Sequence, residues 1–66
     1  MTQKIIEVVG TSTESFAKAS EAAVKEAVKT VRNMKWAHID SLDMMLEGGK
    51  VVQYRATTKI YFDVEG

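Results

Sequence analysis

The amino-acid sequence predicts an α+β domain with the element order β-α-β-β. Three observations lead to this fold class. Residues 51–64 alternate apolar and polar side chains without Gly or Pro, which is typical of one long β-strand. Residues 13–33 repeat small and apolar side chains at intervals of three and four, which indicates an amphipathic helix. Gly48 and Gly49 precede the long strand, where two adjacent glycines favour a hairpin turn.

Length and composition limit the protein to one small domain, residues 1–66. A core of this size is marginal without disulfides, a metal or oligomerisation. The chain has no Cys and only one His, His38, so we expect no disulfide and no metal site, and oligomerisation is the expected support. Nine basic and nine acidic residues argue against nucleic-acid binding. No apolar run is long enough for a membrane span and no signal-peptide pattern is present, so we expect a cytoplasmic protein without a membrane partner.

The first predicted strand covers residues 4–9 and is expected to end at Gly10. Thr11 and Glu14 have the spacing of a capping box, in which a hydroxyl and a carboxylate satisfy each other's backbone N–H groups. Ser12 is an equally good cap, so two helix starts remain open.

The helix is predicted over residues 13–33, with charged side chains opposite an apolar stripe. Small side chains in that stripe predict that the helix lies close against the sheet. The stripe consists of Phe16, Ala19, Ala23, Ala27, Thr30, Val31 and Met34.

A second strand is predicted over residues 36–46, where neither face is cleanly apolar or polar. Such a strand is either bulged or packed on both sides at different points. Asp40 and Asp43 are three residues apart, so we expect them to face opposite ways and not to act as a carboxylate pair.

The strand at residues 51–64 spans about 45 Å at about 3.3 Å per residue. A chain this small cannot cover both faces and both edges of such a strand. The run Met44-Met45-Leu46 adds apolar surface near the hairpin, although Met also serves as local core filling. The sequence therefore predicts association with further copies of itself.

Enzyme motifs are absent from the chain, which has no Gly-rich phosphate loop, no HExxH and no nucleophile beside a base, so we expect no catalysis. Trp36 is the only Trp. It is either an aromatic plug at the end of the core or an exposed surface on which a flat ligand stacks. Gln53 and Arg55 share one face of the third strand and either bind the edge of such a ligand or form a solvated polar face.

Three segments resemble one known family over nearly the whole chain. They are Val8-Val9-Gly10-Thr11-Ser12 followed by Ser15-Phe16, the run Thr30-Val31-Arg32-Asn33-Met34-Lys35-Trp36, and the hairpin Gly49-Lys50-Val51-Val52-Gln53-Tyr54. Taken in order, the three segments are similar to the dodecins.

The resemblance implies a three-stranded antiparallel sheet partly wrapped around one long helix, assembled as a hollow homododecamer. Dodecins bind flavins such as FMN and riboflavin and are thought to store or sequester them. The position of Trp36 matches the family Trp that stacks on the isoalloxazine ring. Some members bind coenzyme A, and a calcium-binding branch exists.

Two positions depart from the family pattern. Arg55 stands where flavin binders usually carry Gln, and Asp43-Met44 stands where many bacterial members carry Arg-Gly. Arg only donates hydrogen bonds, whereas Gln also accepts them. We expect Arg55 to favour FMN over riboflavin through its phosphate, with Gln53 as a substitute edge contact.

The expected flavin site therefore comprises Trp36, Arg55, Gln53, His38 and Asp40, with the last two bordering the pocket. The alternative is an oligomeric scaffold that has lost flavin binding and takes another anion, coenzyme A or a metal ion. An Arg55 locked in an ion pair that fills the pocket would favour this alternative.

Overall fold

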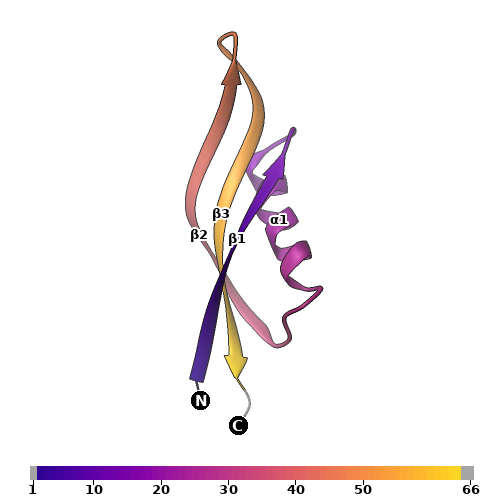
Figure 1. Ribbon diagram of the computed structural model, residues 1–66, viewed down its shortest axis with the longest axis vertical. Helices are drawn as coiled ribbons and strands as arrows, with labels where there is room; N and C mark the ends of the chain where they lie inside the picture. Colours follow the sequence, from indigo (N-terminus) through magenta and orange to yellow (C-terminus); the bar gives the residue numbers. More distant parts are fainter. Residues whose placement is uncertain (1, 65–66) are drawn as a thin grey trace.

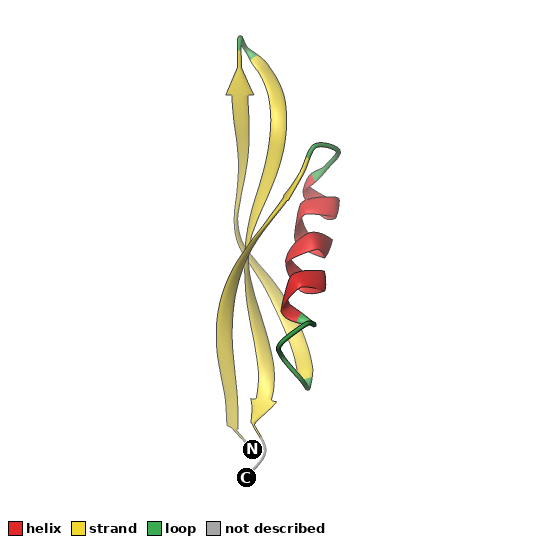
Figure 2. Ribbon diagram, turned by 45° about the vertical axis from the view of Figure 1, so that its right-hand side comes forward, coloured by secondary structure: helices red, strands yellow, loops and turns green. Residues whose placement is uncertain are grey.

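The computed structural model describes residues 2–64, and these form three strands and one helix. The elements are β1 (Thr2–Ser12), α1 (Phe16–Ala27), β2 (Met34–Glu47) and β3 (Lys50–Val64). The strands make one antiparallel sheet in the order β1-β3-β2, and α1 lies on one side of it (Figures 1 and 2). The predicted β-α-β-β order is confirmed. No helix in this range is long and apolar enough to cross a membrane.

The long strand β3 is the centre of the sheet, with β1 on one edge and β2 on the other. Gly48 and Gly49 join β2 to β3 with φ angles of 56° and 77°. Glycine adopts positive φ without steric cost, so these two residues form the tight turn that was predicted. The hairpin extends well past the N-terminal end of α1, and the molecule measures 52 × 18 × 13 Å (Figure 1).

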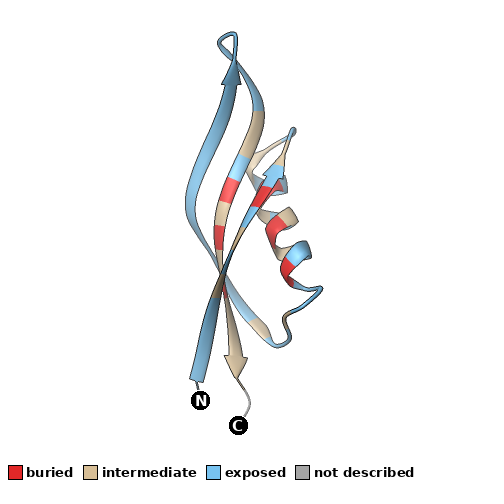
Figure 3. Cartoon of the chain, in the orientation of Figure 1, coloured by how far each residue is buried: buried red, intermediate tan, exposed pale blue. Residues whose placement is uncertain are grey.

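The core lies between α1 and the middle of the sheet (Figure 3). One face of β3 alternates as predicted, so every second side chain points toward α1. Small helix residues allow the close approach that the apolar stripe predicted. Apart from Gly10, the buried residues are Ala19, Ala23, Ala27, Ala56, Thr58 and Ile60. An edge-on contact between the rings of Phe16 and Tyr54, 5.0 Å apart, closes one end of this core.

The prediction that the first strand ends at Gly10 is wrong. β1 continues to Ser12, because β3 is long enough to provide a register partner for every residue up to the pair Ser12–Tyr54. Gly10 lies beneath α1, where an added Cβ would meet the carbonyl oxygen of Ala19. The glycine therefore serves close packing and does not mark the end of a strand.

The helix starts later than expected, and the capping box of Thr11 and Glu14 does not form. Ser15 is the N-cap, and its hydroxyl accepts a hydrogen bond from the backbone N–H of Lys18 at 3.0 Å. Ser12 instead orders the preceding turn, where its hydroxyl accepts from the N–H of Glu14 at 2.9 Å.

The helix also ends at Ala27, well before the predicted residue 33. After the helix, hydrogen bonds span three residues instead of four, as in the bond from the N–H of Thr30 to the carbonyl of Ala27 at 3.1 Å. Asn33 then adopts a left-handed φ of 61°, and its carbonyl accepts from the N–H of Asp63 at 3.0 Å. This hydrogen bond to β3 directs the chain into β2, although the apolar pattern of the predicted helix continues beyond Ala27.

The predicted irregularity of the second strand takes the form of three register shifts against β3, between Met34 and Trp36, Ile39 and Ser41, and Met45 and Leu46. A register shift after Ile39 inserts Asp40 as an extra residue opposite β3. The expectation that Asp40 and Asp43 face opposite ways is wrong as a result. Asp40 lies 3.6 Å from Lys59 and Asp43 lies 3.1 Å from Arg55, and those two cations share one face of β3.

Candidate functional site

The predicted site residues lie on the face of the sheet turned away from α1, which we call the open face. Ala56, Thr58 and Ile60 are buried toward α1, so the alternate residues of β3 point the other way. Strand register adds residues from β2 to this face. The open face carries Trp36, His38, Asp40, Asp43, Gln53, Arg55, Lys59 and Tyr61.

Trp36 is the most exposed large apolar side chain of the described residues, at 69%. It lies opposite Tyr61 in the sheet and lines a cavity of about 350 Å³ with Gln3, Ala37 and His38. His38 is one of the residues that border the Trp36 cavity. The plug interpretation of Trp36 does not hold, because the ring is not in the core. The exposed indole offers a flat surface to an aromatic ligand.

A second cavity, of about 240 Å³, contains the other two expected ligand contacts, Gln53 and Arg55. Its remaining walls are Asp43, Met44 and Met45. These three residues were not predicted as site residues. The register of β2 against β3 brings Asp43 opposite Arg55 and Met45 opposite Gln53, and no sequence motif encodes that register.

Asp43 and Arg55 form an ion pair across the two strands. Oδ2 of Asp43 accepts from Nη2 of Arg55 at 3.1 Å and from Nε at 3.3 Å. The side chains are 46% and 54% exposed, so solvent limits the pair to about 0–1 kcal/mol. The pair does not fill the cavity beside it, and only part of the condition for the scaffold alternative is met.

One chain does not bring Trp36 and Arg55 to the same ligand. Trp36 lies opposite Tyr61, six positions along β3 from Arg55, which corresponds to about 20 Å. That span is longer than an isoalloxazine ring system. Asp40 borders neither of these two cavities. Its carboxylate lies 3.6 Å from the ammonium of Lys59, which is the register partner of His38.

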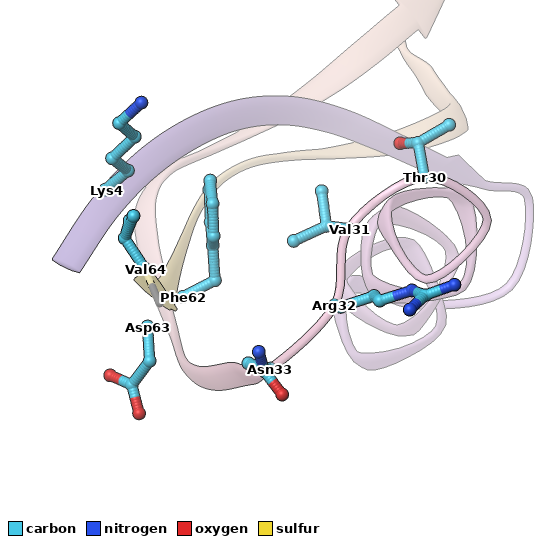
Figure 4. A pocket seen from close by; sticks show the side chains of 8 residues that line it. All are labelled: Lys4, Thr30, Val31, Arg32, Asn33, Phe62, Asp63 and Val64. Carbon is cyan, nitrogen blue, oxygen red and sulfur yellow. The ribbon is translucent and has the colours of Figure 1, made fainter. Parts of the chain in front are cut away.

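A third cavity, of about 440 Å³, lies where the chain enters β2 (Figure 4). Phe62 and Val31 face each other across it, whereas the charged ends of Lys4, Arg32 and Asp63 point in different directions (Figure 4). These groups do not converge on one ligand. Among residues 2–64 there is also no group of three or more acidic or His side chains that could hold a metal ion.

Apolar side chains are exposed over much of the sheet, and β2 is exposed along nearly its whole length (Figure 3). Leu46, near the hairpin tip, is 60% exposed. Soluble monomers rarely expose apolar surface on this scale. The exposed large apolar residues are Ile5, Val9, Val28, Trp36, Ile39, Leu42, Met44, Met45, Leu46, Val51 and Val52.

Comparison with known proteins gives one consistent result. The Dodecin family model matches residues 2–65. A crystal structure of a Thermus thermophilus protein superposes with a TM-score of 0.92 at 29% identity, covering 98% of this chain and 96% of that one. Streptomyces coelicolor dodecin gives 0.91 at 31% identity, with 98% and 93% coverage. Streptomyces davaonensis dodecin gives 0.91 at 25% identity, with 98% and 96% coverage. No curated protein sequence gave a significant match.

Proposed function

The chain belongs to the dodecin family, and on that premise we propose that it is a non-catalytic flavin-binding protein that stores or sequesters FMN or riboflavin. The exposed indole of Trp36 carries this proposal. Apolar surface left in water is unfavourable by about 25 cal/mol per Å², so a Trp held outside the core implies a partner for its ring. Offset stacking on a flat ligand adds about 0.5–1.5 kcal/mol.

The geometry of the open face supports a site built from two copies of the chain. Trp36 and His38 border one cavity, and Arg55 and Gln53 lie in another about 20 Å away. A flavin contacted by all four side chains therefore takes its stacking surface from one copy and its edge contacts from a second. Asp40 neighbours the Trp36 cavity through Lys59 and His38 and acts at its margin.

Exposed apolar surface supports the oligomer that such a site requires. The side chains of β2 project apolar groups along a strand that α1 hardly covers. Association of copies removes that surface from water. We propose the hollow homododecamer of the dodecins as the assembly.

A second candidate function is an oligomeric scaffold without flavin, which takes another anion, coenzyme A or a metal ion. The ion pair of Asp43 and Arg55 favours it, because the pair engages Nε and Nη2 of Arg55 and leaves fewer donors for a flavin. The two candidates predict the same oligomer and differ only in the ligand.

Titration of the purified protein with FMN and riboflavin, read by flavin fluorescence, decides between them. For the flavin-binding function we expect strong quenching that Trp36→Ala abolishes. Val28→Ala removes an exposed apolar group at the C-cap of α1 and is the matched control, with quenching unchanged. A wild-type oligomer that quenches neither flavin would rule out the first function in favour of the scaffold.

A further inference from the structure

Asp43 holds the guanidinium of Arg55 from one side only. Both Nε and Nη2 of Arg55 donate to the same carboxylate oxygen, Oδ2. Within residues 2–64, Oδ1 of Asp43 and Nη1 of Arg55 make no hydrogen bond to the protein. The pair therefore retains a free acceptor and free donors.

The ion pair also neutralises the cavity that contains it. The opposite charges are 3.1 Å apart, and the other walls, Met44, Met45 and Gln53, carry no charge. An isolated Arg would attract a phosphate, but a carboxylate bonded to it cancels that preference. We therefore expect the ion pair to weaken the preference for FMN over riboflavin that an isolated Arg55 would give.

The walls of the cavity suit a flat ring. Met45, opposite Gln53 on the open face, provides a flexible, polarisable thioether that packs favourably against aromatic systems. Because the ion pair is about half exposed, its side chains are able to adjust to a ligand without losing a strong interaction.

We infer that Asp43 and Arg55 together recognise the imide edge of a flat heterocycle, in which a ring N–H stands beside a carbonyl. The carboxylate accepts from the N–H and the guanidinium donates to the carbonyl. This inference rests on the proposed function, since the isoalloxazine ring carries such an edge, with N3–H between two carbonyls. Asp43 is then the specificity-determining residue that supplies the acceptor that Arg55 lacks.

Lumiflavin and its N3-methyl derivative test the inference, because methylation removes the N–H and leaves the stacking surface intact. The intact protein is titrated with both, and with riboflavin and FMN, by flavin fluorescence. We expect methylation to weaken binding about tenfold or more, the scale of a hydrogen bond to a charged group. Riboflavin and FMN should differ by no more than about threefold, because the pair has no net charge.

Three variants complete the experiment. Asp43→Ala should weaken lumiflavin binding about tenfold, abolish the effect of methylation and make the site prefer FMN through the freed Arg55. Asp43→Asn, which keeps the side-chain shape and an acceptor, should shift preference toward FMN while keeping part of the methylation effect. Glu26→Ala breaks an exposed ion pair between α1 and Lys29, which follows the helix, and should change none of these affinities.

The outcomes separate this inference from the proposed function. Equal binding of lumiflavin and its N3-methyl derivative by the wild type would overturn the inference and leave flavin binding in place. A wild-type protein that binds none of the four flavins would overturn both. Light scattering of each variant confirms that its assembly matches the wild type before affinities are compared.

Discussion

A Cβ atom on Gly10 would lie 1.9 Å from the carbonyl oxygen of Ala19. The helix α1 therefore passes β1 at a distance that only a residue without a side chain allows. The same added atom would lie 2.7 Å from the backbone nitrogen of Ala23. Both obstacles are backbone atoms, so rotation of a side chain cannot relieve the contact. Gly10 sets how closely the helix packs on the sheet.

Gly10→Ala should destabilise the protein by about 3 kcal/mol or more, at the upper end of the range for overpacked cores. The helix must move away from β1, which loosens the layer of Ala19 and Ala23. Urea unfolding at one fixed protein concentration measures the loss. A loss of less than about 1 kcal/mol in the free energy of unfolding would mean that α1 does not pack tightly against β1 at Gly10.

Gly48 provides the comparison, because its constraint is conformational and an added Cβ would meet nothing within 4 Å. Gly48→Ala should cost about 1 kcal/mol, since Ala disfavours the φ of 56°. Gly48→Asn should restore most of that stability, because Asn tolerates left-handed backbone. Gly10→Asn should be no more stable than Gly10→Ala. Higher stability of Gly10→Asn would contradict the packing explanation.

Thr58→Val should leave stability unchanged or raise it by about 0.5–1 kcal/mol. Thr58 is fully buried, and its hydroxyl donates only to the carbonyl of Ala56 at 3.5 Å, the outer limit for a hydrogen bond. Thr57→Val, on the open face of the same strand, is the control and should change stability by less than about 0.5 kcal/mol. Clear destabilisation by Thr58→Val would show that the buried hydroxyl bond contributes more than its length indicates.

Leu46→Lys should reduce the size of the assembly measured by multi-angle light scattering. Leu46 is exposed near the hairpin tip, and burial of a Lys charge in an interface is unfavourable. Ala17→Lys places the same side chain on the exposed surface of α1 and should leave the assembly intact. A wild-type protein that elutes as a monomer would contradict both candidate functions.

Co-expression of Trp36→Ala and Arg55→Ala chains should restore flavin sites that neither variant forms alone. If the two side chains come from different copies, random mixing of equal amounts gives about a quarter of the wild-type sites. Stoichiometric fluorescence titration of the mixed oligomer counts them. Mixed assemblies with no recovered sites would place both contacts in one chain, against the roughly 20 Å that separates their cavities.

Much of the fold could be predicted from sequence because its signals are local. The alternation in β3 identified the strand and the face that meets the helix. Gly48 and Gly49 identified the hairpin, since positive φ is a property of the residues themselves. The small residues of α1 predicted close packing, and Ala19, Ala23 and Ala27 are indeed buried.

By itself, then, the sequence determined the order of the elements, the core face of β3 and the identity of Trp36 as the residue that required an explanation. The tertiary structure alone decided where α1 ends, that Asp40 and Asp43 face the same way, and that Trp36 and Arg55 lie in separate cavities. The physical reason is that these features depend on strand register. One bulge after Ile39 changes which side chains face each other, and register is set by contacts between segments far apart in the chain.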